Sequence, residues 1–312
     1  MCEIVVSVAM LTYNHEKYIR QALDSILMQK RSFEIEIVIG DDCSCDNTVK
    51  IIKEYEDIYP GIIRLLPRKK NIGVTANLYE VCKMCKGKYI AFLEGDDYWI
   101  DNQKLQKQVD FLEENPQYSG VAHDFKMIDT KGNGYSHRKC KGEYTFEKFK
   151  WGLIPGQTGT LCMKNFFEDG KDDYKIIVNA SRTIGDRTII LLMLLHGRVY
   201  TINEEMSVYR VFSSASSWSQ SLGKGSKKEN PQYNDMCYYI NLTNYCKQKW
   251  NKNVSALCNK SYCVYAAIER YFHTREMNDK EIMKKTLQIY DENKFLLFLC
   301  CVYLWIRKLA RG

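Results

Sequence analysis

Residues 87–99 read GKYIAFLEGDDYW, an apolar run that ends in a cluster of acids. The run at residues 89–93 is typical of a strand buried on both faces of a parallel sheet covered by helices. Ligands of such sheets bind beyond the carboxyl ends of the strands, which is where Glu94, Asp96 and Asp97 stand. Three hard oxygen ligands on a short loop suit Mg²⁺ or Mn²⁺, usually together with substrate phosphates. A solvated acidic turn is the alternative.

Strands and helices alternate before this stretch. Apolar runs predict strands over residues 4–11, 35–39 and 62–66, and helical spacing predicts helices over 16–28, 48–55 and 74–85. Short loops between alternating elements imply right-handed βαβ units and a parallel sheet. The second strand also ends in acid, at Asp41 and Asp42. Two strands that end in acid at the same sheet edge favour a functional site over a solvated turn.

The pattern becomes less regular after residue 100 and helical near the end. We expect a helix over 104–114, strand-like pieces at 120–122 and 125–128, a Gly-rich loop at 151–160, a helix over 187–196, and strands at 199–202 and 206–211. Residues 223–230 are a candidate Gly/Lys/Ser linker. The expected organisation is therefore a domain over 1–222 and a helical C-terminal region over 223–312.

Composition sets broad limits on the function. The chain has 312 residues, of which 45% are hydrophobic and 27% charged, which is typical of a globular protein. The formal net charge of +7 is a mild bias. It permits attraction to anionic lipids or phosphate ligands but does not indicate nucleic-acid binding.

Thirteen Cys residues raise the question of redox state and metal binding. Residues 2–11 lack the basic lead and cleavage site of a secretory signal, so we expect a cytoplasmic protein with reduced thiols. The pairs Cys43/Cys45 and Cys82/Cys85 lack the further Cys or His pair of a zinc site. We expect buried thiols instead.

Residues 295–306 are twelve uncharged residues followed by Arg307, Lys308 and Arg311. A helix of this length is too short to span a bilayer comfortably. An apolar helix with a cationic end can lie at an anionic membrane surface, here over residues 295–311. The alternative is a terminal helix packed on the protein's own core. The expected location is thus cytoplasmic, with peripheral binding at the inner face of the cell membrane as one option.

Four motifs occur in order: TYN at 12–14, GDDCSCDNT at 40–48, NIGVTAN at 71–77 and LEGDDYW at 93–99. Over roughly residues 1–215, the chain resembles glycosyltransferase family 2. The resemblance implies inverting enzymes of the GT-A fold that use nucleotide-sugar donors. That fold is a Rossmann-like, mostly parallel sheet flanked by helices, to which this chain would add a C-terminal helical extension.

The resemblance also implies which residues bind the donor nucleotide. They are Thr12, Tyr13, Asn14, Asp41, Asp42, Asn77, Glu94, Asp96 and Arg210. Asp42, or its neighbour Asp41, would accept a hydrogen bond from the ring N–H of uracil, which favours uridine over cytidine.

Two positions depart from the family pattern. Many members carry a basic residue just before Asn77, where this chain has Thr75 and Ala76, neither of which offers a cationic side chain to the diphosphate. Glu94 replaces the usual Asp and is expected near the ribose or a bound water. The basic residues Arg64, Arg68, Lys69 and Lys70 are expected to form a solvated face.

The resemblance assigns metal binding and catalysis to three carboxylates. Asp96 would bind Mn²⁺ or Mg²⁺, and Asp97 would help to form the metal site. Asp186, just before the helix at 187–196, would be the base that deprotonates the acceptor hydroxyl, with a plain N-cap as the alternative. Tyr209 and Arg210 match a late family motif, in which Arg210 would reach the diphosphate, with an exposed Arg on a strand as the alternative. Residues 213–217 would form a lid. Residues 157–160 would face the acceptor.

The expected function is an inverting transfer of a sugar from a nucleotide sugar, with UDP favoured. The acceptor would be a glycan or lipid-linked glycan in the synthesis of a bacterial surface polysaccharide such as capsule or lipopolysaccharide. A sugar-phosphate nucleotidyltransferase would need a Gly-rich, Arg-containing loop after the first strand, which residues 7–14 lack. A catalytically inactive, nucleotide-sugar-binding scaffold subunit remains the alternative, although Asp96 and Asp186 are both present.

Overall fold

The computed structural model describes residues 3–66, 68–129, 131–136, 140–168, 170, 172, 174–211 and 231–309, with side chains up to residue 306. The chain divides into two compact units. Met1–Thr145 and Ile154–Ser213 belong to the first, and Phe146–Leu153 and Ser214–Gly312 to the second. The predicted domain boundary near residue 223, the linker and the predicted lid lie outside the described residues.

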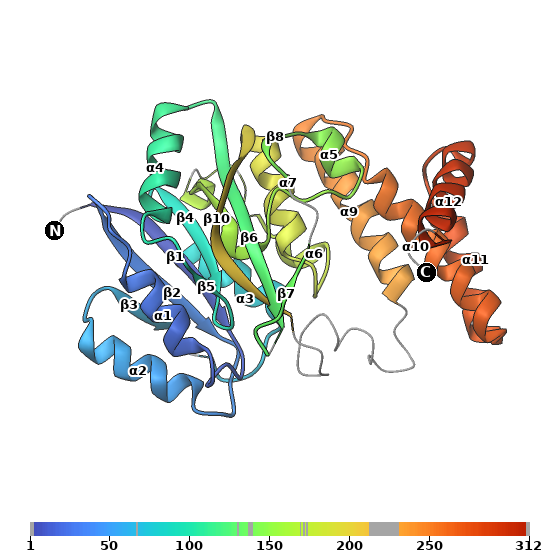
Figure 1. Ribbon diagram of the computed structural model, residues 1–312. Helices are drawn as coiled ribbons and strands as arrows, with labels where there is room; N and C mark the ends of the chain where they lie inside the picture. The colour runs from blue at the N-terminus through green and yellow to red at the C-terminus, as the bar shows by residue number, and fades with distance from the viewer. Residues whose placement is uncertain are drawn as a thin grey trace. The chain divides into compact units, whose positions relative to one another are not determined.

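The first unit contains one ten-stranded sheet (Figure 1). Its strands are β1 (Ile4–Thr12), β2 (Glu34–Asp41), β3 (Ile63–Leu66), β4 (Tyr89–Glu94), β5 (Tyr98–Trp99), β6 (Tyr118–Asp129), β7 (Gly134–Tyr135), β8 (Gly142–Tyr144), β9 (Cys162–Lys164) and β10 (Arg198–Val211). The main order is β3-β2-β1-β4-β9-β6-β10-β5, with β7 beside β6 and β8 beside β10. The first four are parallel, as are β6 and β10. The predicted α/β fold with a mostly parallel core is confirmed.

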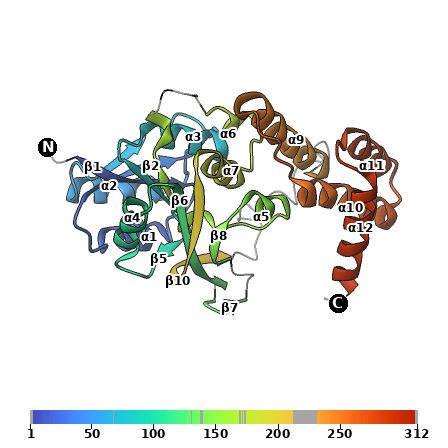
Figure 2. The same ribbon diagram turned by 90° about the horizontal axis from the view of Figure 1, so that it is seen from above.

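Helices cover both faces of the sheet (Figure 2). They are α1 (Ile19–Leu27), α2 (Thr48–Ile58), α3 (Val74–Met84), α4 (Lys104–Glu114), α6 (Ile176–Asn179) and α7 (Asp186–His196), with 3₁₀ turns η1 (Thr158–Thr160) and η2 (Phe166–Glu168). Alternate β1, β2 and β4 side chains form one core with apolar residues of α1, α2 and α4. On the opposite face, α3 packs on β1 and β2, and α7 packs on β6 and β10.

The strands of the second half differ from the prediction. Two pieces were predicted where β6 is one strand, because His123 is fully buried and continues the strand through a polar sequence. β10 is likewise one strand, although its register shifts at an exposed, acidic bulge between Ile202 and Glu205. β9 was not predicted. Its three residues carry no periodic signal, yet it joins β4 to β6 in antiparallel fashion.

The second unit is helical. It contains α5 (Phe146–Lys150), α9 (Pro231–Trp250), α10 (Leu257–Thr274), α11 (Met277–Ile289) and α12 (Lys294–Leu309). Helix α10 contacts each of the other four. None of the helices in the described parts of the chain has the length and apolar character needed to cross a membrane.

The cysteine prediction is half right. Cys82 and Cys85 are buried thiols, as expected, and burial raises the pKa of both. Cys43 and Cys45 are exposed in the loop after β2, so the prediction of burial was wrong for them. Both lie in the loop between β2 and α2, in which Cys43 has a left-handed backbone (φ 69°).

Candidate functional site

The carboxyl ends of three neighbouring strands meet at one edge of the sheet. In the register of β1, Thr12 pairs with Asp41 of β2, and Leu11 pairs with Glu94 of β4. The prediction that both acidic clusters share this edge is therefore confirmed. The edge has two parts, an acidic turn after β4 and a loop pair after β1 and β2.

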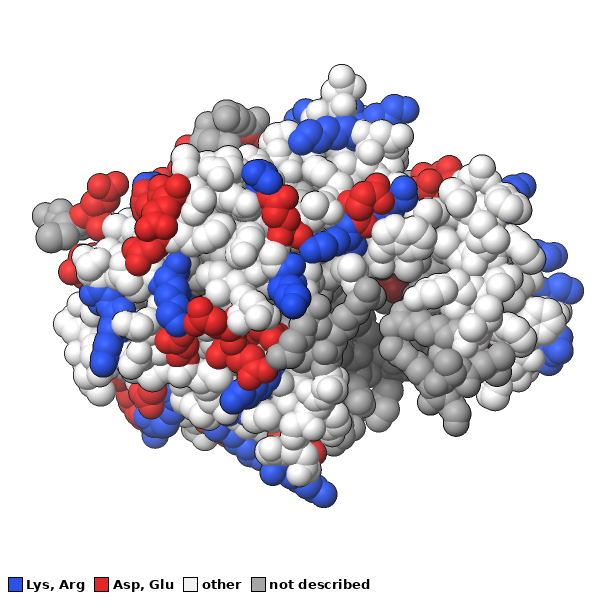
Figure 3. Space-filling model, turned by 45° about the horizontal axis from the view of Figure 1, so that its top comes forward, with Lys and Arg blue, Asp and Glu red and all other residues white. Residues whose placement is uncertain are grey.

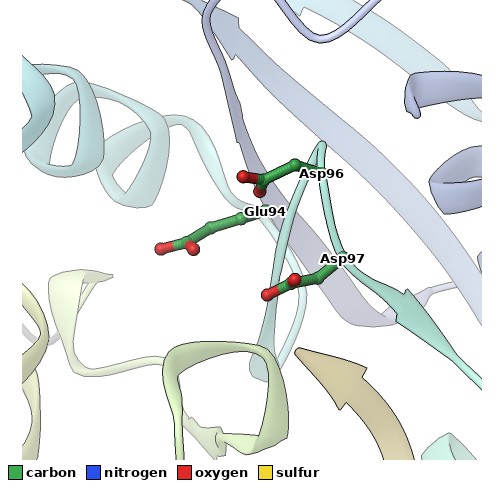
Figure 4. A group of neighbouring side chains, drawn as sticks. All are labelled: Glu94, Asp96 and Asp97. Atoms are coloured by element: carbon green, nitrogen blue, oxygen red, sulfur yellow. The ribbon is translucent and has the colours of Figure 1, made fainter. Parts of the chain in front are cut away.

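The acidic turn brings three carboxylates together. Oxygens of Glu94, Asp96 and Asp97 lie within 4.8 Å of one another, and the three side chains point into the same space (Figure 4). Gly95 lets the turn lie close to β1 and α1. A Cβ at this position would be 2.9 Å from Nδ1 of His15 and 3.0 Å from Oγ1 of Thr12. The turn therefore requires glycine at its second position.

The carboxylates of Asp97 and Asp96 differ in what surrounds them. Asp97 is buried, and its two oxygens accept hydrogen bonds from the Arg210 backbone N–H (2.8 Å) and from Nε2 of Gln157 (3.2 Å). Asp96 is half-buried, with Nε2 of His15 at 3.7 Å from its Oδ2. Within the described residues, no group donates a hydrogen bond to the Asp96 carboxylate. Asp96 is thus the carboxylate most available to a ligand.

Glu94 is the member of the acidic turn that is influenced by the charges of both Asp96 and Asp186. Burial, together with the charges of Asp96 and Asp186, raises the pKa of Glu94 to about 8, and the side chain of Thr158 opposes this by hydrogen bonding. Burial, together with the charges of Asp96 and Glu94, raises the pKa of Asp97 well above its usual value. Ionising these neighbouring acids together therefore costs electrostatic free energy, which a bound cation would offset.

Asp186 begins α7, after Gly185. Gly185 is packed so closely against α3 that a Cβ would be 2.6 Å from Cδ2 of Leu78. The N-cap of α7 is Gly185, and Asp186 is the first residue of the helix. The charge of Asp186 acts on Glu94 and on the hydroxyl of Tyr209. The structure thus brings this carboxylate to the acidic turn, 90 residues away in sequence.

The acidic cluster fits a divalent cation. Among the acidic, His and Cys side chains of the described residues, those of Glu94, Asp96 and Asp97 lie close enough together to hold such an ion. Two ligand oxygens on opposite sides of Mg²⁺ lie about 4.2 Å apart. Small movements of these side chains would therefore bring their oxygens to the distances that the ion requires. Each oxygen of Asp97 keeps a second lone pair beyond its hydrogen bond. All-oxygen ligands favour Mg²⁺ or Mn²⁺ over zinc.

The acids after β2 are tied into the loops around them. Asp41 accepts hydrogen bonds from the backbone N–H and hydroxyl of Ser44, at 2.8 and 2.5 Å. Asp42 accepts from the backbone N–H groups of Ile72 and Gly73, at 2.7 and 3.0 Å. Both carboxylates therefore hold these loops in place. The ring N–H of a nucleobase would donate to a carboxylate oxygen that already accepts one hydrogen bond.

The turn after β1 joins the same loop. Asn14 has a left-handed backbone (φ 57°), donates from its N–H to Oγ of Ser44, and accepts from the Cys45 N–H. Thr12 is buried, and its hydroxyl has no hydrogen-bond partner among the described residues. Tyr13 is 47% exposed, so its ring is open to a ligand. The three predicted residues lie together.

Asn77 lies beneath the end of β2. Its Nδ2 donates to the Gly40 carbonyl (2.7 Å), and its Oδ1 accepts from Nη2 of Arg68 (3.3 Å). Arg68 was expected on a solvated face, but it is half-buried and its Nε is fully shielded without a partner in the described part of the chain. Through these two hydrogen bonds Asn77 connects α3 to the end of β2 and orients Arg68.

Arg210 is held by protein groups on several sides. Its guanidinium lies between the rings of Tyr18 and Tyr98, with centroids at 4.8 and 4.6 Å. It donates to the Asp96 carbonyl and, at 2.5 Å, to Oε1 of Gln21. In this arrangement Arg210 clamps the acidic turn to α1. Its predicted contact with a diphosphate stays a prediction.

Two residues at the site had no role assigned to them from the sequence. His15 follows the TYN motif and reaches Asp96, and Tyr209 precedes Arg210 with its hydroxyl acted on by four carboxylates, which together with burial raise its pKa. The Tyr-Arg pair in sequence was the available signal for Tyr209. His15 had none, because its proximity to Asp96 depends on the packing of β1 against β4.

Comparison with known proteins gives a consistent family. The model of the family described as "Glycosyl transferase family 2" matches residues 7–170. The chain is 43% identical over 126 residues to an uncharacterised protein of Mycobacterium bovis, covering 40% of this chain and 36% of that protein. It is 36% identical over 131 residues to the putative teichuronic acid biosynthesis glycosyltransferase TuaG of Bacillus subtilis, covering 40% and 51%. Both matches span about half or less of those relatives.

Solved structures show the same fold. S. aureus TarS 1–349 in complex with UDP has a TM-score of 0.54 at 17% identity, with 93% of both chains covered. The same TarS fragment in complex with UDP-GlcNAc has a TM-score of 0.54 at 16% identity, covering 91% of this chain and 90% of TarS. At such low sequence identity the structural similarity is evidence for the fold alone. It confirms the predicted GT-A architecture.

Proposed function

The chain belongs to glycosyltransferase family 2, and from this we propose that it transfers a sugar from a UDP-sugar, with inversion, to a hydroxyl of a glycan or lipid-linked glycan. The process proposed is the assembly of a bacterial surface polysaccharide, such as capsule or lipopolysaccharide. The observation that carries the proposal is the convergence of the Glu94–Asp97 turn and Asp186 at one edge of the sheet.

The loops after β1 and β2 are proposed to bind the nucleoside. Tyr13 is exposed beside Asn14, whose bonds to the Ser44 loop fix the turn. Asp42, or Asp41, offers a carboxylate oxygen to the ring N–H of uracil. The hydroxyl of Thr12, without a partner in the described chain, is a donor or acceptor for this ligand. That TarS binds UDP on the same fold supports the choice of UDP.

The acidic turn is proposed to face the diphosphate. Asp96 and Asp97, with Glu94 beside them, would hold Mn²⁺ or Mg²⁺. Such an ion neutralises the negative charge that develops on the leaving nucleoside diphosphate. Arg210 and Gln157 keep Asp97 in place, so the turn is already formed before the donor binds.

Asp186 is proposed as the general base. Transfer with inversion requires the acceptor hydroxyl to attack the anomeric carbon from the face opposite the diphosphate, and its proton to leave as the new bond forms. A carboxylate at the start of α7 that also acts on Glu94 lies beside the acidic turn, where this proton is released. The position of the carboxylate beside the acceptor hydroxyl would supply much of the effect.

The experiment is release of UDP from a panel of UDP-sugars, with Mn²⁺ or EDTA, by the wild type, Asp186→Asn and Asp110→Asn. Asp110 is an exposed acid on α4 and serves as the control. We expect Mn²⁺-dependent release by the wild type and the control, and loss of release with retained UDP binding by Asp186→Asn. UDP binding without turnover in the wild type would favour the scaffold alternative instead.

The membrane contact predicted for residues 295–311 is part of the proposed function. A lipid-linked acceptor lies at a membrane surface, so an enzyme acting on it gains from binding there. The proposed location is cytoplasmic, with peripheral attachment at the inner face of the membrane.

A further inference from the structure

Helix α12 is apolar on both of its sides, but its own unit covers only one. Leu297 and Cys300 are 8% and 7% exposed, and with Cys301 and Leu304 they form the inner side at spacings of three and four residues. The outer side is between 37% and 67% exposed at every position. It consists of Phe295, Leu296, Phe298, Leu299, Val302, Tyr303, Trp305 and Ile306.

An outer side of this composition calls for a partner. Solvent-facing helix positions are usually polar, and a helix that is apolar all round is normally buried. Contiguous exposed apolar patches on soluble proteins mark interaction sites. The polar atoms that this outer side offers are the hydroxyl of Tyr303 and the ring N–H of Trp305, which suit a boundary between apolar and aqueous surroundings.

The start of α12 is fixed to the rest of its unit. Lys260 of α10 is fully buried and donates from Nζ to Oδ1 of Asp291 (2.8 Å) and Oε1 of Glu292 (3.2 Å). The hydroxyl of Ser255 also donates to Glu292. The outer side is therefore presented by an anchored helix. The two acids nearest to α12, Asp291 and Glu292, are thus paired with Lys260.

The charge of this region indicates what the partner is. Residues 231–312 contain 13 Lys and Arg against seven Asp and Glu, which is +6 of the chain's net +7. From Lys294 onward there are four basic residues and no acid. Figure 3 shows the surface at the place of α10–α12 as largely uncharged, with Lys and Arg along its outer edge.

We propose that the outer side of α12 inserts into the interface of an anionic lipid bilayer. Its apolar side chains would enter the region of the upper acyl chains, and the basic residues at both ends would meet lipid phosphates. The 16 residues of α12 reach about 24 Å, less than the ~30 Å hydrocarbon core, so the helix would lie along the surface. A second copy of the chain fits less well, because two regions of +6 would repel each other.

The inference is independent of the proposed transfer reaction. It concerns where the chain is held, and sugar transfer to a soluble acceptor would leave it intact. It defines the face of the helix that binds, which the sequence alone left open between a membrane surface and the protein's own core. The inner side meets the core, and the outer side is assigned to lipid.

The test is co-sedimentation of the full chain with vesicles of phosphatidylcholine alone or with about one third phosphatidylglycerol. The variant Phe298→Glu/Val302→Glu/Trp305→Glu alters only exposed positions. The control Met28→Glu/Ile58→Glu/Met84→Glu places the same charges at exposed apolar positions of the first unit. Thermal unfolding of each variant checks the fold, and light scattering without lipid reports the oligomeric state.

We expect the wild type and control to bind anionic vesicles about tenfold more tightly than neutral ones, and the α12 variant to lose at least about tenfold. Quenching of tryptophan fluorescence by brominated lipids should fall in Trp305→Phe, which keeps an apolar ring. The proposal is overturned if the wild type stays in the supernatant or the α12 variant sediments like the wild type. A lipid-free dimer that the α12 variant converts to monomer would also overturn it, in favour of a second copy.

Discussion

The backbone N–H of Arg210 donates a 2.8 Å hydrogen bond to Oδ1 of Asp97, across 113 residues of sequence. This bond joins the last long strand of the sheet to the acidic turn after β4. The guanidinium of the same residue extends between Tyr18 and Tyr98 and donates to the carbonyl of Asp96. One residue thus holds the acidic turn through both its backbone and its side chain.

Arg210→Lys should destabilise the protein, because lysine cannot stack between two rings or donate from a planar fork. We expect a loss of about 1–2 kcal/mol in the free energy of unfolding, with weaker Mn²⁺ binding, measured by denaturant unfolding and calorimetry. Arg20→Lys is the control, since Arg20 forms an exposed ion pair with Glu54. Reduced UDP affinity with unchanged stability would instead support a direct contact of Arg210 with the diphosphate.

Gly95→Ala should disturb the acidic turn. The added methyl would lie 2.9 Å from Nδ1 of His15 and 3.1 Å from Cδ1 of Ile19, so the turn or α1 must shift. We expect a cost of about 1–3 kcal/mol and at least tenfold lower kcat, since a displacement of about 1 Å at a site is costly. At Gly134 an added Cβ would make only an ordinary contact, 3.9 Å from the Met127 carbonyl oxygen, so Gly134→Ala should leave both unchanged. Equal effects of the two variants would contradict the close packing described.

Glu94→Gln should change how stability depends on pH. The pKa of Glu94 is about 8 in the folded protein and about 4.3 when unfolded, so the folded state binds the extra proton between these values. The metal-free wild type should therefore lose stability as the pH rises from 5 to 8, by at least about 1 kcal/mol relative to Glu94→Gln. Thermal unfolding in EDTA across this range measures the difference. If the stability of the two proteins changed with pH in the same way, Glu94 would ionise in the folded protein without a loss of stability, contrary to this prediction.

Lys104→Met tests how the fully buried Lys104, at the start of α4, affects the pH dependence of stability. Nζ of Lys104 lies 3.9 Å from the centroid of Trp99 and donates to Oε1 of Gln108, and burial lowers its pKa to about 7. The unfolded chain then binds the extra proton between about pH 7 and 10.4, so the wild type should gain stability with rising pH. We expect a gain of about 1–2 kcal/mol relative to Lys104→Met between pH 7 and 10. An identical pH dependence of the two proteins would refute the lowered pKa.

The features that the sequence predicts well are local ones. The strand before Glu94 and the strand before Asp41 are continuous apolar runs, so their ends and their shared edge follow from periodicity and the rules of parallel sheets. The start of α7 at Asp186 follows from Gly185 and the apolar run behind it.

Features that depend on packing between distant segments could not be predicted in this way. The clamp of Arg210 on Asp97, the approach of His15 to Asp96 and the partner of Arg68 each join residues brought together only by the fold. The exposure of Cys43 depends on a left-handed backbone that its neighbours do not signal.

The most direct test of the account is calorimetric titration of UDP into the wild type, Asp96→Asn and Asp110→Asn, each with Mn²⁺ and with EDTA. If the edge formed by β1, β2 and β4 is a metal-assisted donor site, Mn²⁺ should strengthen UDP binding by at least about tenfold in the wild type and in Asp110→Asn. Asp96→Asn should show no such gain while remaining folded. UDP that fails to bind the wild type, or binds it equally well in EDTA, would contradict the account.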